Sequence, residues 1–136
     1  MVKWYKDGTK AIRPELLDGE AQNQAKKWAV SKDRNNEPVF TTTQLRRYYG
    51  EAKNLERQMQ VLAANANAWD SVYPLVKMLK SKVSYDMRKD NKIPQQFKEF
   101  IFESVDSIKE EADFRAFLKY FEASVGFYYG EGKGKA

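Results

Sequence analysis

Apolar side chains recur along this chain at intervals of three and four residues, the spacing that places them on one side of an α-helix. No stretch alternates apolar and polar residues as a half-buried strand would. We therefore predict an all-α protein, a compact bundle of about five helices. The predicted helices run from about Pro14 to Val30, from Thr41 for about five turns, from Asp70 or Ser71 to Arg88, from near Pro94, and from Glu111 to Gly130.

The second predicted helix has the clearest start signal. Thr41 and Gln44 form the T-x-x-Q of a capping box, in which each side chain accepts a hydrogen bond from the other residue's backbone N–H. The apolar stripe of the third helix is rotated by roughly 110° from that of the second on one helical wheel, so we expect a break between them. These stripes are Leu45, Tyr49, Ala52, Leu55, Met59 and Leu62, then Trp69, Val72, Val76, Leu79, Val83 and Met87.

The last two helices are expected to supply much of the core. Pro74 is expected in the first turn of the third helix, where its missing N–H costs little, and Gly130 is expected to end the fifth. We predict one domain over residues 1–136, with flexible ends at 1–13 and 130–136. The inward positions are Phe97, Phe100, Ile101, Val105 and Ile108, followed by Phe114, Phe117, Leu118, Phe121, Val125 and Tyr128.

Composition removes several classes of chemistry. The 136 residues include no Cys and no His, which excludes thiolate nucleophiles, imidazole bases, disulfides and Cys/His zinc sites. No phosphate loop, dinucleotide fingerprint, serine-hydrolase or calcium-loop spacing occurs, so we expect neither catalysis nor a cofactor. With no run of 18 apolar residues and no secretory signal pattern, we expect a cytoplasmic protein with no membrane partner.

The charge favours an anionic partner. Lys and Arg number 24 against 19 acidic residues, a net charge of +5. Arg46, Gly50, Lys53 and Arg57 are spaced by four, three and four, so they share one face of the second helix, roughly 160° from its apolar stripe. Gly50 leaves room there for a sugar-phosphate backbone or another helix, at a cost of about 1 kcal/mol in helix stability. The alternative is an ordinary solvated face.

Tyrosines and the third helix extend this pattern. Tyr49 falls in the apolar stripe and is expected in the core, whereas Tyr48, nearer the edge, is more open and could stack on a base. Six cations and two acids between residues 77 and 92 give a local charge of 6 − 2 = +4. On one side of this helix, basic and hydroxyl side chains suited to phosphate recur at Lys77, Ser81, Ser84 and Arg88.

Acidic residues gather near the start of the fifth helix. The group gives a local charge of 1 − 5 = −4, with Lys109 as its one cation: Glu103, Asp106, Glu110, Glu111 and Asp113. Segregated charge suits a basic face on nucleic acid with an acidic face on a protein, or copies that meet head to tail. A magnesium-dependent nuclease is a weaker alternative, because metal ligands usually converge from separate elements.

Two segments carry a family resemblance. "TTTQLRRYYGEAKNLE" and "FRAFLKYFEASVGFYYGEGKGK" resemble segments of the small subunit of type III-A CRISPR-Cas effectors, the Csm complex. The first has a threonine-capped helix with a glutamine-leucine-arginine start, an aromatic pair and a small residue. The second has an aromatic-rich run, Glu122-Ala123, a tyrosine and a glycine-lysine tail. The resemblance runs from about Val39 to Lys135.

The resemblance implies a non-catalytic, self-associating subunit of an antiviral complex. Several copies would lie along the guide RNA and its paired target RNA, beside backbone subunits that cut RNA and a large subunit that degrades DNA and synthesises cyclic oligoadenylate. The residues expected to contact phosphates without reading bases are Arg46, Arg47, Lys53 and Arg57 from the second helix, and Lys77, Lys80, Ser84 and Arg88 from the third.

Two other functions stay open from the residues alone. A helical protein-interaction adaptor would have basic faces that are only solvated, and a small DNA-binding helical protein would prefer a duplex site. Binding experiments over a range of salt concentrations distinguish these functions. An RNA-tracking subunit binds RNA of almost any sequence, and this binding weakens steeply as salt rises, whereas the adaptor binds no RNA.

Overall fold

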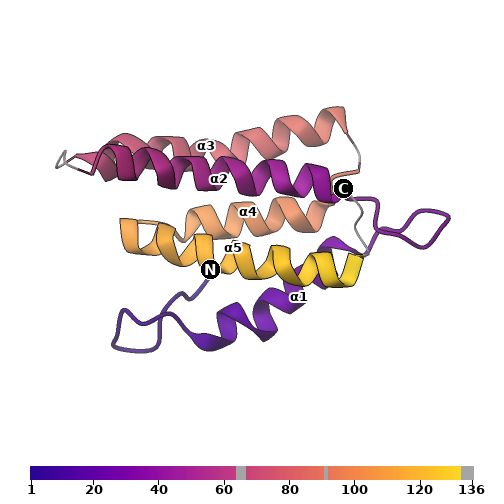
Figure 1. Cartoon of the computed structure of the whole chain (residues 1–136), viewed down its shortest axis with the longest axis horizontal. Helices are drawn as coiled ribbons and strands as arrows, with labels where there is room; N and C mark the ends of the chain where they lie inside the picture. Colours follow the sequence, from indigo (N-terminus) through magenta and orange to yellow (C-terminus); the bar gives the residue numbers. More distant parts are fainter. Residues whose placement is uncertain (64–66, 91, 133–136) are drawn as a thin grey trace.

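A computed structural model of the chain describes residues 1–63, 67–90 and 92–132. Within these residues the elements are five α-helices and one short 3-10 helix, and no strand is present, which confirms the predicted all-α fold. The helices α2 and α3 form one pair, α4 and α5 lie against it, and α1 covers the opposite side of α5 (Figure 1). The packed pairs are α2 with α3, α3 with α4, α2 with α5, and α1 with both α4 and α5.

Helix α2 (Thr42–Val61) begins where the sequence indicates. Thr41 is its N-cap, and its Oγ1 accepts a hydrogen bond from the Gln44 backbone N–H at 3.1 Å. The Gln44 side chain accepts one from the Thr41 backbone N–H, also at 3.1 Å, so the capping box is complete. Helix α3 (Ala68–Lys89) is a separate element, and the predicted break between the two helices is confirmed.

The extent predicted for the first helix, Pro14 to Val30, is wrong. A 3-10 turn (Pro14–Leu17) comes first, and α1 occupies only Gly19–Trp28. Asp18 separates them with φ −119° and ψ −102°, a non-helical conformation that a continuous α-helix does not allow. Proline suits the start of such a turn because its fixed φ is already near helical and its missing N–H is not needed there.

Two other boundaries differ from prediction. Helix α3 begins at Ala68, ahead of the expected caps, so Pro74 lies inside the helix and not in its first turn. Helix α5 (Glu111–Gly132) continues through Gly130, where we expected it to end. Helix α4 (Gln95–Asp106) follows Pro94 as predicted, with Pro94 at its N-cap position.

Aromatic rings fill the centre of the molecule. Trp28 from α1 packs edge-on against Phe97 and Phe100 of α4, with ring centroids 5.1 and 4.9 Å apart. Phe121 of α5 completes the group at 6.3 Å from Trp28. The inward positions predicted for the last two helices are all buried, because these rings and their aliphatic neighbours form one continuous core.

The first thirteen residues are attached to the turn between α4 and α5. Trp4 is buried and its Nε1–H donates to the Ser107 carbonyl at 2.9 Å, while the Val2 backbone N–H donates to Ser107 Oγ at 2.9 Å. The predicted flexibility of residues 1–13 stays a prediction. Of the predicted tail, residues 133–136 lie outside the described residues. None of the described helices is long and apolar enough to cross a membrane.

Candidate nucleic-acid interface

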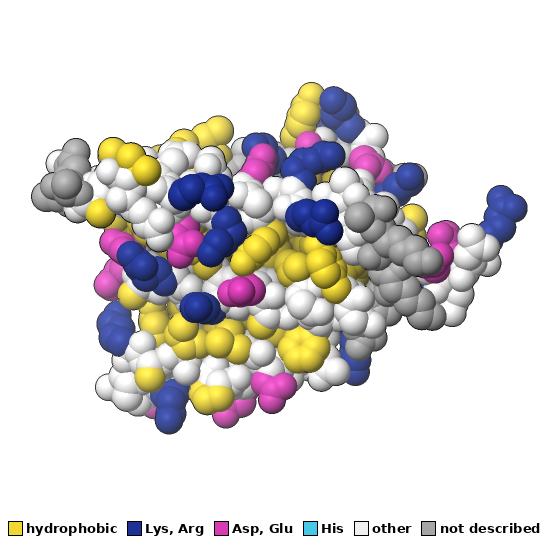
Figure 2. Space-filling model, in the orientation of Figure 1, with side chains coloured by type: hydrophobic (Ala, Val, Ile, Leu, Met, Phe, Trp, Pro, Cys, Tyr) yellow, Lys and Arg dark blue, Asp and Glu magenta, His cyan; other side chains and the backbone are white. Residues whose placement is uncertain are grey.

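The outer face of α2 carries the first half of the predicted site. Arg46, Gly50 and Arg57 are exposed, and Lys53 is half-buried, so the stripe points away from the core as its spacing predicts. Arg47 is also exposed, one position further round the helix. Figure 2 shows basic side chains lying over this part of the molecule. The face therefore offers guanidinium and ammonium groups to an anion from solution.

The cations of this face differ in their existing partners. Lys53 Nζ lies 2.7 Å from Glu56 Oε1, and the hydrogen bond to this carboxylate raises the pKa of Lys53. Arg57 and Arg47 form no ion pair within the described part of the chain. The two arginines are therefore better placed than Lys53 to neutralise an added phosphate.

Arg46 is held by a residue that sequence reasoning missed. Its Nε–H donates to the Tyr129 hydroxyl of α5 at 3.2 Å, and the guanidinium carbon lies 5.9 Å from the Tyr129 ring centroid. Tyr129 lies eighty-three residues away in sequence, so only the packing of α2 against α5 brings the two together. In the sequence, only the position of Tyr129 in the aromatic-rich C-terminal segment pointed to this residue.

In the third-helix half of the predicted site, Lys80 faces α4. Lys80 Nζ forms an ion pair with Asp106 Oδ1 at 2.6 Å and lies 4.9 Å from the Phe102 ring centroid. Lys77 Nζ lies 5.3 Å from the ring of Tyr73. The two remaining residues are Ser84, which is half-buried, and Arg88, which is exposed.

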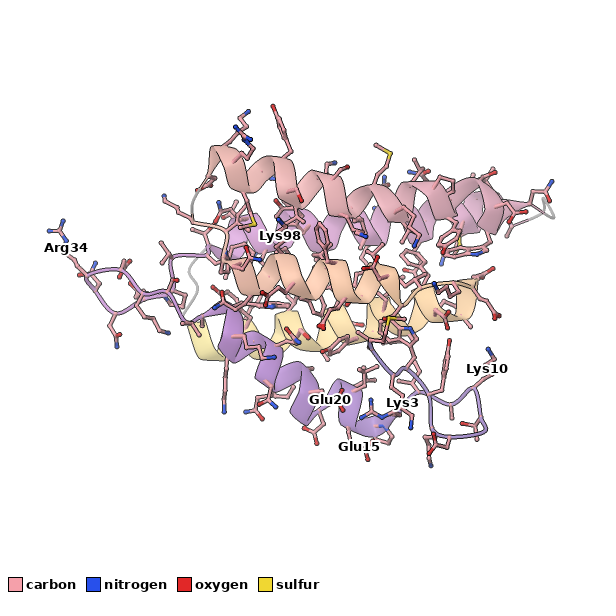
Figure 3. The ribbon with its side chains drawn as sticks, turned by 180° about the vertical axis from the view of Figure 1, so that it is seen from behind. Lys3, Lys10, Glu15, Glu20, Arg34 and Lys98 are labelled. Atoms are coloured by element: carbon pink, nitrogen blue, oxygen red, sulfur yellow. The ribbon has the colours of Figure 1, made fainter. Side chains whose placement is uncertain are left out.

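The eight predicted contact residues do not form one site. Arg46 and Lys53 lie along the border of α2 with α5, which faces the viewer in Figure 1. Lys80 lies along the border of α3 with α4, which faces the viewer in the reversed view of Figure 3, where Lys98 of α4 is labelled. The structure thus places two basic surfaces on opposite sides of the α2–α3 pair.

The prediction for Tyr48 is wrong, whereas Tyr49 packs against the core as predicted. Tyr48 is 4% exposed, and its hydroxyl donates to Asp86 Oδ2 of α3 at 2.5 Å. Burial and this hydrogen bond raise the pKa of Tyr48 far above its ordinary value. Tyr49 is only half-buried, with its ring 5.3 Å from Phe121. Tyr48 is therefore no base-stacking residue, because its ring and hydroxyl are both committed inside the bundle.

Gly50 has a counterpart on the neighbouring helix. Gly126 of α5 is exposed, and it lies one turn before Tyr129 just as Gly50 lies one turn after Arg46. A Cβ added at either glycine would meet nothing within 4 Å. The packing inside this chain therefore does not require a glycine at either position.

A family model now gives these surfaces a context. The model for Csm2 Type III-A matches residues 16–132, which takes in every helix of the bundle. The chain belongs to the Csm2 Type III-A family. The match begins ahead of Val39, so it extends the resemblance seen in the two sequence segments to the first helix. No curated protein and no solved structure matches the chain.

Membership of the Csm2 family makes the chain a structural small subunit of a type III-A CRISPR-Cas effector complex, which contains other subunits. The acidic residues of this Csm2 chain are largely engaged with its own groups. Asp106 pairs with Lys80, Glu111 Oε2 lies 2.5 Å from Arg115 Nη2, and Asp113 accepts hydrogen bonds from the Tyr5 hydroxyl and two backbone N–H groups. No group of acidic residues in the described ranges is arranged to hold a metal ion.

A cleft with a volume of about 600 Å³ lies between α2 and α3 of this Csm2 chain. Its charged groups are already paired: Lys82 Nζ binds Glu51 Oε1 at 2.5 Å, and Asp86 accepts the Tyr48 hydrogen bond. The cleft therefore offers apolar walls and satisfied charges, and not a free base next to a nucleophile.

Proposed function

We propose that this Csm2-family chain binds RNA and assembles in several copies along the guide RNA and its paired target RNA, in a complex of antiviral defence. The observation that carries the proposal is the family match over residues 16–132. The contacts are to phosphates through basic helix faces, with the backbone and large subunits of the complex as neighbours. Such contacts position an RNA without reading its sequence.

The face of α2 is the principal RNA surface in this proposal. Arg46 and Arg57 are exposed, neither forms an ion pair among the described residues, and Lys53 lies between them on the same stripe. Phosphates that replace water at such groups release counterions from the RNA, which makes the binding strong at low salt and weak at high salt. Gly50, at the middle of the stripe, leaves the helix backbone uncovered where the strand passes.

The face of α3 has a lesser part. Lys80 is already neutralised by Asp106 at 2.6 Å, and Lys77 lies over a tyrosine ring. An RNA phosphate must compete with Asp106 for Lys80, so its net gain there is smaller than at an unpaired arginine. Arg88 is the cation of this set that is exposed and has no ion pair within the described residues.

Charge reversal of the α2 face tests the proposal. The triple variant Arg46→Glu, Lys53→Glu, Arg57→Glu is expected to lose RNA binding, because it replaces three attractive charges by three repulsive ones, while its helical circular dichroism is unchanged. Binding is measured by fluorescence anisotropy with RNAs of unrelated sequence over a salt series. Loss of three phosphate contacts lowers the slope of log K against log salt by about 2 for a single strand.

The matched control reverses three exposed cations elsewhere in the chain. Lys6→Glu, Lys32→Glu and Arg34→Glu together change the net charge equally, from +5 to 5 − 6 = −1, and none of these residues forms an ion pair among the described residues. We expect this control to bind RNA with only a small loss. Equal losses in both triple variants would mean that net charge and not the α2 face drives the binding.

The alternative functions give different outcomes. A wild-type chain that binds no RNA at low salt contradicts the proposal and supports the adaptor. Preference for one duplex DNA sequence supports the DNA-binding protein instead.

A further inference from the structure

A tyrosine ring is not itself a phosphate ligand, so phosphate binding by the α2 face does not explain why the ring of Tyr129 is exposed. Its side chain is 38% exposed, and among the tyrosines only Tyr85, at 62%, is more open. An exposed aromatic ring next to a basic helix face is the arrangement by which proteins hold single-stranded nucleic acid, with phosphates on the cations and bases stacked on the ring. Tyr129 and Arg46 bring these two features into contact across α2 and α5.

The contact leaves both groups able to bind a nucleotide. Arg46 uses its Nε–H to donate to the Tyr129 hydroxyl at 3.2 Å, so the four N–H groups on its two terminal nitrogens remain for a phosphate. No carboxylate pairs with Arg46 within the ranges that the structure describes. The hydrogen bond also fixes the guanidinium 5.9 Å from the ring centroid, so that less side-chain freedom is lost on binding.

The surface around the pair is open. Gly50 and Gly126 lie one turn from Arg46 and Tyr129 respectively, and an added Cβ at either glycine would point into empty space. The two helices therefore present no side chain at these positions beside the ring. Glu122, earlier on α5, acts through its charge on Lys53 of α2.

We infer that Tyr129 and Arg46 form a stacking site for an unpaired base of RNA, in which the ring takes the base and the guanidinium takes a neighbouring phosphate. This inference rests on the proposed function and adds that the bound RNA includes bases that are not paired. The bases of a duplex are already stacked on each other and do not reach a tyrosine ring. The site therefore favours single-stranded over double-stranded RNA.

An abasic strand separates stacking from phosphate binding. Binding of the full chain to fluorescent oligouridine is compared with binding to an abasic strand of the same length. Tyr129→Ala is expected to weaken oligouridine binding by about 10-fold and abasic binding by a much smaller factor, because the abasic strand loses only the ordering of Arg46 by the Tyr129 hydroxyl. Tyr129→Phe keeps the ring and so keeps oligouridine affinity close to that of the wild type. Arg46→Gln weakens binding to both strands, because both carry phosphates.

Tyr85 provides the matched control. It is an exposed tyrosine with Lys89 Nζ 5.2 Å from its ring centroid, but it lies on α3 beside the cleft and its paired acids. Tyr85→Ala is expected to bind both strands as the wild type does. Equal losses for Tyr129→Ala on the two strands, or no loss on either, overturn the stacking site and leave the proposed function standing. A wild-type chain that binds neither strand at low salt refutes the proposed function and the stacking site with it.

Discussion

At the scale of single residues, Gly50 combines exposure with a position at the centre of the basic stripe of α2. A glycine inside a helix costs about 1 kcal/mol relative to alanine, because the unfolded chain loses more freedom on folding. No neighbouring atom within the chain needs the space, since a Cβ at Gly50 would meet nothing within 4 Å. The residue is therefore explained by a partner that approaches the helix or by tolerance of a small local cost.

We predict that Gly50→Ala raises the free energy of unfolding by about 1 kcal/mol, or the melting temperature by about 3 to 5 °C for a domain of this size. Gly126→Ala, at the matching position of α5, is expected to stabilise the chain similarly. Thermal unfolding followed by circular dichroism measures both. If Gly50→Ala stabilises the free chain but also assembles with RNA as well as the wild type does, close approach of a partner at Gly50 is excluded.

Helix starts show which elements the sequence predicts well. The capping box of α2 is correct to the residue because both of its hydrogen bonds are made within four consecutive residues. The predicted apolar stripe of α3 is also correct, because the spacing of its apolar residues can be read from that helix alone, without knowing which helices pack against it. The start of α1 is wrong because Asp18 leaves the helical region of φ and ψ, which no propensity of the flanking residues indicates.

The start of α5 depends on Asp113 and gives a prediction about pH. Burial alone would raise the pKa of Asp113, but hydrogen bonds from the Tyr5 hydroxyl and from the backbone N–H groups of Lys109 and Glu110 outweigh it and lower the pKa. A lowered folded-state pKa stabilises the fold above the unfolded value of about 4 and loses this effect as pH falls through the folded pKa.

Asp113→Asn is therefore expected to lower the free energy of unfolding by about 2 kcal/mol at pH 7, and by progressively less below about pH 4. Urea unfolding at pH 7 and at pH 3 measures the difference. Asp106→Asn, which removes the exposed pair with Lys80, serves as the control with a small effect at either pH. If Asp113→Asn lowers the free energy of unfolding by the same amount at pH 3 as at pH 7, the negative charge of Asp113 does not contribute to the stability of the fold.

At the scale of the whole molecule, the packing of the helices decides which residues share a surface. The helical wheel places Arg46 outward on α2, and the charge pattern adds Lys80 of α3 to the same predicted site. In the structure Arg46 is exposed and Lys80 is half-buried. No wheel states which sides of the two helices face each other, and the structure puts these residues on opposite sides of the pair. For the same reason, neither Tyr129 at Arg46 nor Asp86 at Tyr48 follows from the sequence, because each contact joins separate helices.

The two basic surfaces are expected to contribute unequally to RNA affinity. Charge reversal of the α3 surface, by Lys77→Glu, Lys80→Glu and Arg88→Glu, should weaken RNA binding by a smaller factor than the corresponding change on α2, since Lys80 already has a carboxylate partner. Anisotropy titrations of the two triple variants at one salt concentration make the comparison. A larger loss from the α3 variant would reverse the assignment of the principal surface.

The attachment of the first residues to the turn before α5 bears on how the chain is made. Val2 and Tyr5 bind partners 105 and 108 residues later in the sequence. At a synthesis rate of about 5–20 residues per second, those partners are translated about 5 to 20 seconds after the N-terminus. During this interval the apolar ring of Trp4 stays exposed, because the residues that bury it in the folded chain have not been translated. The N-terminal contacts can form only after Ser107 and Asp113 have been translated, so a chain stalled before Ser107 keeps that ring exposed to chaperones and proteases.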